Sequence, residues 1–184
     1  MTGKLNILLA MPGQRDKFFN KSVILLVEDD ESGSMGFAIN IKTGKSLADM
    51  VSQIEPDKFV EIDVPILLGG PVKTDFLWVM HDPSKSYDST LKLFDELHLS
   101  AGQDVIPDIL KSSAPEVFAM GVGYSGWQKG QLEREINDGA WWKLSDFAFN
   151  IFDSDKNKLW ESGIKELGIN LENFYGEEPS GLLN

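Results

Sequence analysis

The chain has 184 residues, of which 42% are hydrophobic and 25% are charged, a composition typical of a single folded domain. Its 29 acidic and 17 basic residues give a formal net charge of -12, which disfavours direct binding to nucleic acid because phosphates repel an acidic surface. It contains no cysteine, so disulfides, thiol nucleophiles and thiolate metal sites are excluded.

Strands dominate the first half of the sequence. Aliphatic and β-branched runs predict strands at residues 6–10, 22–28, 35–41, 66–68 and 76–81. A polar, glycine-containing turn joins the second and third of these runs, which predicts a β-hairpin. Ser46 and Asp49 form a helix-capping signal, so we expect a short helix that runs through Gln53. The segment between Pro56 and Pro65 is expected to be irregular or to lie at a sheet edge.

Helices become more frequent in the second half. Periodicity predicts helices at residues 100–111, 128–138 and 158–167, and strands at residues 116–122 and 141–144. Pro107 removes one backbone donor from the first of these helices and is expected to bend it. Residues 91–99 fit neither the helical nor the strand period. We place one domain at residues 1–176, followed by a polar tail at 177–184 that is expected to fray.

The order of these elements favours an α+β fold. Strands follow one another in the first half without regular helical crossovers, which argues against a doubly wound parallel sheet. We expect a single domain with a mixed, mostly antiparallel sheet that is flanked by helices. The apolar runs are far shorter than the roughly 20 residues needed to cross a bilayer, and the first residues lack the apolar stretch of a signal peptide. We therefore expect a cytoplasmic protein without membrane contact.

A glycine-rich segment, Gly121–Gly126, has the spacing G-x-G-x-x-G between a predicted strand and a predicted helix. In dinucleotide-binding proteins this spacing lets backbone amides approach a pyrophosphate. Such a site also requires an acidic residue at the end of the next strand, and none ends the segment 140–144. We favour a structural strand-to-helix turn and predict no cofactor. Gly69-Gly70-Pro71 could cradle an anion, but here too a tight turn is the favoured interpretation.

Ser125 lies in the same segment and could act as a nucleophile at a strand-to-helix elbow. The G-x-S-x-G pattern is not met, because Trp127 stands in place of the second glycine. A hydrolase or phosphate-handling enzyme, with Ser125 assisted by Asp16 and Glu133, is an alternative function. It requires these side chains to lie within hydrogen-bonding distance.

The two histidines, His81 and His98, are the only imidazoles in the sequence. Their spacing is neither H-x-H nor H-x-x-x-H, so no zinc site is predicted. Nothing in the sequence brings either ring to Ser125, as a catalytic triad would require. We therefore assign no catalytic residue and no metal ligand.

Polar residues beside the glycine-rich segments indicate a binding surface. Trp127 is expected in a loop, where an exposed ring would anchor a ligand or a partner. The predicted surface comprises Asn40, Ser125, Trp127, Gln131 and Glu135.

Several short motifs follow one another in a specific order along nearly the whole chain. The early ones are Leu9-Ala10-Met11-Pro12, Asp16 with Phe18-Phe19, Ser22-Val23 and Met35–Asn40. The later ones are Leu68–Val72, Gly123–Trp127, Gln131-Leu132-Glu133 with Glu135, Trp141, Trp160 and Leu167-Gly168. In this order they resemble the YqgE/AlgH family of bacterial proteins.

The resemblance implies a compact α+β fold with a curved, partly barrel-like sheet, in a protein of the bacterial cytoplasm. It supplies no catalytic residues. The name of one member links the family to regulation of alginate production, so a transcriptional regulator is a further alternative, with direct DNA binding disfavoured by the acidity. The preferred prediction is a non-enzymatic binding or regulatory protein that acts through a protein partner or a small ligand.

Overall fold

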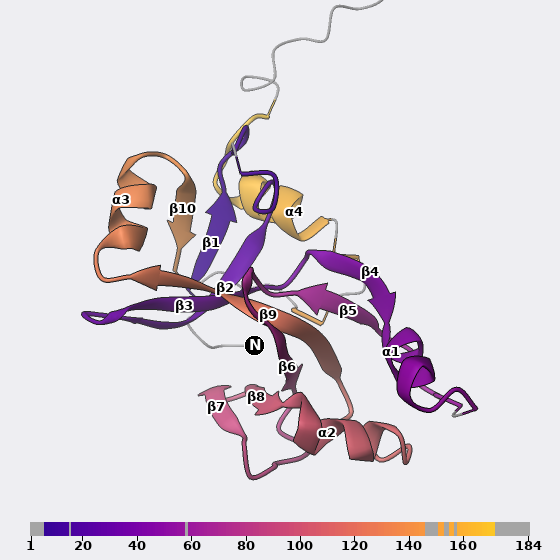
Figure 1. Ribbon diagram of the computed structural model, residues 1–184. Coiled ribbons are helices and arrows are strands. Elements are labelled where there is room, and N and C mark those ends of the chain that lie inside the picture. Colours follow the sequence, from indigo (N-terminus) through magenta and orange to yellow (C-terminus); the bar gives the residue numbers. More distant parts are fainter. Residues whose placement is uncertain are drawn as a thin grey trace, which may run out of the picture.

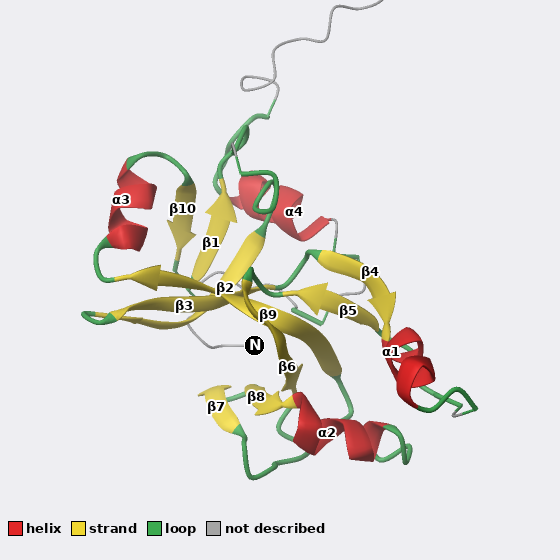
Figure 2. Ribbon diagram, viewed as in Figure 1, coloured by secondary structure: helices red, strands yellow, loops and turns green. Residues whose placement is uncertain are grey.

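The computed structural model describes residues 6–14, 16–57, 59–145, 151–152, 155–156 and 158–171. Within these residues, ten strands form one sheet and four helices pack around it, which confirms the predicted single α+β domain (Figure 1, Figure 2). The strands are β1 Ile7–Ala10, β2 Val23–Asp30, β3 Gly33–Ala38, β4 Lys42–Ser46, β5 Pro65–Leu68, β6 Val72–His81, β7 Leu91–Phe94, β8 Leu97–Ala101, β9 Phe118–Gln128 and β10 Trp141–Leu144. The helices are α1 Leu47–Ile54, α2 Gly102–Ile109, α3 Gln131–Asn137 and α4 Lys158–Glu166.

The sheet is mostly antiparallel and open. Its main path runs β10-β1-β2-β3-β9-β6-β8-β7, so β10 and β7 form two ends and the sheet is not closed. β5 pairs in parallel with β9, and β4 pairs with the other side of β5. The family resemblance implied a curved, partly barrel-like sheet. In the structure the sheet is open, with β10 and β7 at the ends of its main path.

β9 joins the two parts of the sheet and crosses the centre of the molecule in Figure 1. Its first residues lie between β5 and β6, whereas residues 125–128 pair with β3. The motif Gly121–Gly126 therefore lies inside a strand, and the predicted strand-to-helix turn is wrong. Packing explains the glycine at position 121, because a Cβ there would overlap the indole of Trp78. The missing side chain of Gly121 therefore makes room for the indole of Trp78, whereas in a dinucleotide site it would make room for a phosphate.

Both faces of β1 are buried. Ile7 and Leu9 face a cluster that includes Trp160 of α4, whereas Leu8 and Ala10 face a second cluster beneath α3. A third cluster lies between α1, α2 and the strands β6 and β9. Burying one large aliphatic side chain stabilises the fold by about 1.5–3 kcal/mol. The three clusters therefore explain how the four short helices are held against the sheet.

The helix α1 begins where the sequence predicts. Ser46 Oγ accepts a hydrogen bond from the Asp49 backbone N–H, and the Asp49 carboxylate accepts one from the Ser46 N–H, which completes a capping box. The Ser22–Ile41 region forms the predicted hairpin of β2 and β3.

Other elements also differ from the prediction. The ambiguous residues 91–99 form the hairpin of β7 and β8. The polar strand β4 was not predicted, because it has no apolar alternation and its backbone pairing with β5 decides its conformation. The helix α3 begins three residues later than residue 128, after Gly130, whose φ of 70° suits glycine.

The C-terminal tail at 177–184 lies outside the described residues, and the domain boundary at residue 176 stays a prediction. Within the described ranges, no helix is long and apolar enough to cross a membrane.

Candidate functional site

Three of the five predicted surface residues form one hydrogen-bonded group on β9 and α3. Trp127 lies in the strand β9 and is only 7% exposed, so the expectation of an exposed ring in a loop is wrong. The ring belongs to the apolar cluster beneath α3, because alternate side chains of β9 point to the covered face of the sheet. It therefore cannot serve as the ligand anchor that the sequence suggested.

The Glu135 carboxylate is the centre of this group. Its Oε2 accepts hydrogen bonds from the indole N–H of Trp127 at 2.9 Å and of Trp141 at 2.8 Å. Its Oε1 accepts one from the side-chain amide of Gln131 at 2.9 Å. The Gln131 oxygen in turn accepts the backbone N–H of Gln128 at 3.0 Å. We call Trp127, Gln131, Glu135 and Trp141 the Glu135 network.

Helix periodicity explains how the sequence builds this network. Gln131 and Glu135 are four positions apart and lie on one side of α3, above the two indoles. The rings of Trp127 and Trp141 pack edge to face with their centroids 6.0 Å apart. The network therefore ties α3 to both β9 and β10.

Replacing Glu135 with alanine is expected to lower the free energy of unfolding by about 2–4 kcal/mol, because two indole N–H groups lose their acceptor in a largely buried place. Glu135→Gln is expected to cost less, since one amide oxygen remains to accept from an indole. Urea denaturation followed by far-UV circular dichroism measures both. Glu133→Ala on the exposed side of α3 is the matched control, and an equal loss in the control would contradict the role of the network.

Ser125 and Asn40 hold backbone segments elsewhere. The Ser125 hydroxyl is buried and donates to the Gly69 carbonyl oxygen at 3.1 Å. The Asn40 side chain accepts from the Val23 N–H and donates to the Lys21 carbonyl oxygen, both at 2.8 Å. Neither side chain takes part in the Glu135 network, so the predicted five-residue surface is divided among three places.

The geometry required for a hydrolase based on Ser125 is not met. Asp16 accepts a hydrogen bond from the Phe18 backbone N–H, and Glu133 is exposed on α3. In the described part of the chain, neither carboxylate is hydrogen-bonded to Ser125. The strand conformation of residues 121–126 also removes the elbow that would expose a nucleophile.

A serine–histidine contact does occur, between residues that the sequence did not pair. His81 Nε2 lies 2.8 Å from the Ser100 hydroxyl, and its Nδ1 lies 2.7 Å from the Asp82 carbonyl oxygen. A carbonyl oxygen only accepts, so Nδ1 carries the proton and Ser100 donates to Nε2. Thr90 then donates to Ser100 at 2.7 Å. Only the pairing of β6 with β8 brings these groups together, so sequence spacing carried no signal of it.

Burial governs the chemistry of this chain of hydrogen bonds. Both His81 and Ser100 are buried, and the loss of solvent around the ring lowers the pKa of His81. The Nδ1 of neighbouring His98 is buried without a hydrogen-bond partner, and the two rings meet edge to face at 5.7 Å. The His81 ring is neutral and both of its nitrogens are hydrogen-bonded within the protein, which explains why the ring can be buried. Within the described residues, no three histidine, aspartate or glutamate side chains group closely enough to hold a metal ion.

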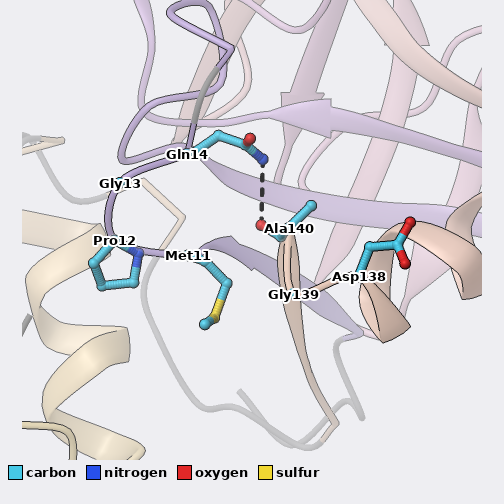
Figure 3. Close-up of a pocket in the computed structure, with 7 residues that line it drawn as sticks. All are labelled: Met11, Pro12, Gly13, Gln14, Asp138, Gly139 and Ala140. Carbon is cyan, nitrogen blue, oxygen red and sulfur yellow. Dashed lines mark hydrogen bonds between the residues drawn. The ribbon is translucent and has the colours of Figure 1, made fainter.

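A pocket of about 390 Å³ lies beside the turn between α3 and β10. Its walls are Met11–Gln14, which follow β1, and Asp138–Ala140 (Figure 3). Figure 3 shows the Gln14 side chain reaching across to the Ala140 carbonyl oxygen, which accepts its amide N–H at 3.3 Å. The Met11 N–H donates to the same oxygen at 3.0 Å. Because Trp141 follows Ala140 directly, the Glu135 network positions one wall of this pocket.

Comparison with known proteins identifies the family. A family model described as AlgH-like matches residues 7–172. The chain belongs to the AlgH-like family. The resemblance drawn from the ordered motifs is therefore confirmed.

Relatives of this AlgH-like chain come from several bacteria. It is 36% identical over 175 residues to a UPF0301 protein of Photobacterium profundum. The alignment covers 92% of this chain and 94% of the relative. It is 34% identical over 170 residues to a UPF0301 protein of Shewanella woodyi, covering 90% and 91% respectively. These alignments extend along nearly the full length of both partners.

Solved structures agree with the fold. The solution structure of the AlgH protein from Pseudomonas aeruginosa is 35% identical, covers 96% of this chain and 95% of that chain, and has a TM-score of 0.73. A crystal structure of a Corynebacterium diphtheriae protein is 18% identical with a TM-score of 0.66, covering 88% of this chain and 85% of that chain. The second likeness shows a common fold alone.

The AlgH-like chain also exposes large apolar side chains at the end of α1 and in the connection from α1 to β5. Ile54 is 78% exposed, Phe59 is 83% exposed and Ile62 is 38% exposed. Other exposed large apolar residues in the described part of the chain are Phe76, Leu91 and Val117. Single exposed apolar residues are ordinary, but three within nine positions of the chain need an explanation. In the sequence this signal consists of large apolar residues, Phe59 and Ile62, within the stretch between Pro56 and Pro65 that was expected to be irregular.

Proposed function

We propose that this chain is a non-enzymatic binding protein that acts through a protein partner. The observation that carries the proposal is the set of exposed apolar side chains Ile54, Phe59 and Ile62 at the end of α1 and in the connection that follows it. Large apolar side chains at the centre of a protein interface supply much of its binding energy. Burying them against a partner removes apolar surface from water, which is favourable at about 25 cal/mol per Å².

The arrangement of the reactive groups supports the same proposal. The hydroxyls of Ser100 and Ser125 and the ring of His81 are buried and hydrogen-bonded inside the protein. They stabilise the contacts between strands, and a substrate would have to displace those bonds before either hydroxyl could react.

Affinity capture from a bacterial lysate, followed by mass spectrometry, tests the proposal. We expect the tagged wild-type chain to retain at least one protein that the variant Phe59→Ser does not retain. Leu91→Ser, which changes an exposed apolar residue on β7, is the matched control and is expected to capture the same protein as the wild type. Identical capture by all three proteins would refute the proposal.

A second candidate is binding of a small ligand in the pocket between Met11–Gln14 and Asp138–Ala140. A volume of about 390 Å³ lies within the range of small-molecule sites. The side chains of Gln14 and Asp138, together with backbone groups of the two turns, would orient such a ligand. This pocket and the apolar connection lie at different elements of the fold, so the two candidates do not compete for one surface.

A further inference from the structure

Residues 54–63, which comprise the last residue of α1 and most of the connection to β5, combine apolar and acidic residues in close alternation. Four acidic residues and the single basic residue Lys58 give this stretch a formal charge of -3. Its apolar members are Ile54, Phe59 and Ile62, and its acidic members are Glu55, Asp57, Glu61 and Asp63, all of them exposed. We call these seven residues the acidic–apolar segment. In Figure 1 the helix α1 and the connection that follows it lie at the periphery of the molecule, away from α3 and α4.

The backbone of this segment is anchored at several points. Asp63 accepts the backbone N–H of Ala48 at 2.9 Å, which ties the end of the connection to the start of α1. Glu61 accepts a hydrogen bond from the Ser112 hydroxyl in the turn after α2. Val60, which precedes Glu61, packs against the cluster beneath α1 and α2. Phe59 and Ile62 are therefore displayed from a backbone held by neighbouring elements, which reduces the entropy lost when a partner binds.

Three carboxylates of the segment, those of Asp57, Glu61 and Asp63, take no part in the ion pairs found among the described residues. The ion pairs found there join Lys85 to Asp108, Lys92 to Asp95, Lys143 to Asp29 and Lys158 to Asp155. None of them includes Asp57, Glu61 or Asp63. These carboxylates add to the overall charge of -12, so the segment attracts cations from a distance.

We propose that the acidic–apolar segment is the docking site for a basic amphipathic segment of the partner protein, one that carries aliphatic side chains flanked by lysine or arginine. Its aliphatic side chains pack on Phe59 and Ile62, and its cations approach the surrounding carboxylates. Charge complementarity of this kind raises the association rate and selects the partner, while the apolar contact supplies affinity. This proposal rests on the proposed function and specifies the chemistry of the partner.

The same charges argue against two other occupants. A second copy of the chain would bring identical rows of carboxylates together, and like charges in apposition cost free energy. The cytoplasmic face of a membrane is anionic and would repel the segment in the same way. A basic protein segment is the occupant that satisfies both the apolar and the acidic residues.

A designed peptide supplies the test. A fluorescent helical peptide of leucine and lysine is titrated with the full chain in 50 mM salt, and its anisotropy gives the dissociation constant. A peptide with glutamate in place of lysine is the control for charge. We expect at least about tenfold weaker binding of the leucine–lysine peptide to Phe59→Ser and to the double variant Asp57→Asn/Glu61→Gln, and about tenfold weaker binding of the glutamate peptide to the wild type. Higher salt is expected to weaken binding of the leucine–lysine peptide to the wild type.

The control variant Asp75→Asn/Glu133→Gln removes two exposed carboxylates at other places on the surface. It is expected to bind the leucine–lysine peptide within about twofold of the wild type. Dissolved salt screens the attraction of carboxylates that lie far from the bound peptide, so removing them changes the affinity little. Equal weakening by the two double variants, or no effect of Phe59→Ser, would overturn the proposal. Urea midpoints confirm that all variants are folded.

Failure of this proposal differs from failure of the proposed function. Loss of capture from the lysate by Phe59→Ser, with full capture by Asp57→Asn/Glu61→Gln, would uphold protein binding and refute a basic partner. Unchanged capture by Phe59→Ser would refute protein binding at this surface altogether.

Discussion

Replacing Gly70 with alanine is expected to lower the free energy of unfolding by more than about 4 kcal/mol, a large part of the total stability of a typical domain. A Cβ on Gly70 would overlap the backbone of Tyr124 and Ser125 in β9. Backbone atoms in a paired strand cannot move aside as the end of a flexible side chain can, so the turn after β5 would have to separate from β9. Urea denaturation monitored by circular dichroism, with expression in the soluble fraction, measures the effect.

Gly126→Ala is the matched control for this prediction. Gly126 also lies in β9, but an added Cβ would approach only the ring of Tyr124, at 3.5 Å, which is ordinary contact. We expect this variant to unfold within about 1 kcal/mol of the wild type. If Gly70→Ala were as stable as Gly126→Ala, the close approach of the Gly69-Gly70-Pro71 turn to β9 would be wrong.

Trp78→Ala is expected to lower the free energy of unfolding by about 3–5 kcal/mol. The ring is fully buried where β6 meets β9, packs against Phe37 with centroids 5.1 Å apart, and fills the space left by the missing side chain of Gly121. Its indole N–H donates to the Gly123 carbonyl oxygen at 2.8 Å, and that oxygen would lose its partner. The expected loss combines the cavity with the lost hydrogen bond.

Two further variants separate these contributions. Trp78→Phe keeps an aromatic ring but no N–H, and we expect it to lose less stability than Trp78→Ala. Leu91→Ala, in the exposed part of β7, is expected to change stability by less than about 0.5 kcal/mol. A midpoint for Trp78→Ala as high as that of Leu91→Ala, in the same urea titration, would contradict the burial of the ring.

Local patterns in the sequence predicted most of the elements. The β2–β3 hairpin and the capped start of α1 follow from short-range chemistry, namely a polar turn between apolar runs and the pair Ser46 and Asp49. The β7–β8 hairpin did not follow, because residues 91–99 lack clear alternation and depend on pairing with β6.

The candidate site was predicted only in part. Gln131 and Glu135 do lie on one side of a helix, as their spacing of four requires. Their partners could not be foreseen, since Trp127 and Trp141 reach Glu135 through the sheet order and not through neighbouring positions. Trp127 was misplaced for the same reason: a glycine-rich segment is compatible with a loop, but its pairing with β3 makes it a strand.

The sequence by itself determined the family, the α+β class, the acidic surface and most of the individual strands and helices, because composition and short periodic patterns act over a few residues. Only the tertiary structure decided which groups meet: His81 with Ser100, Glu135 with two indoles, and Gly121 with Trp78. These contacts join residues on different strands and helices, and strand order and register set them through the burial of apolar side chains over the whole domain. The glycines were conspicuous in the sequence, but whether each one accommodates a ligand, a turn or a tryptophan ring depends on what the folded chain brings against it.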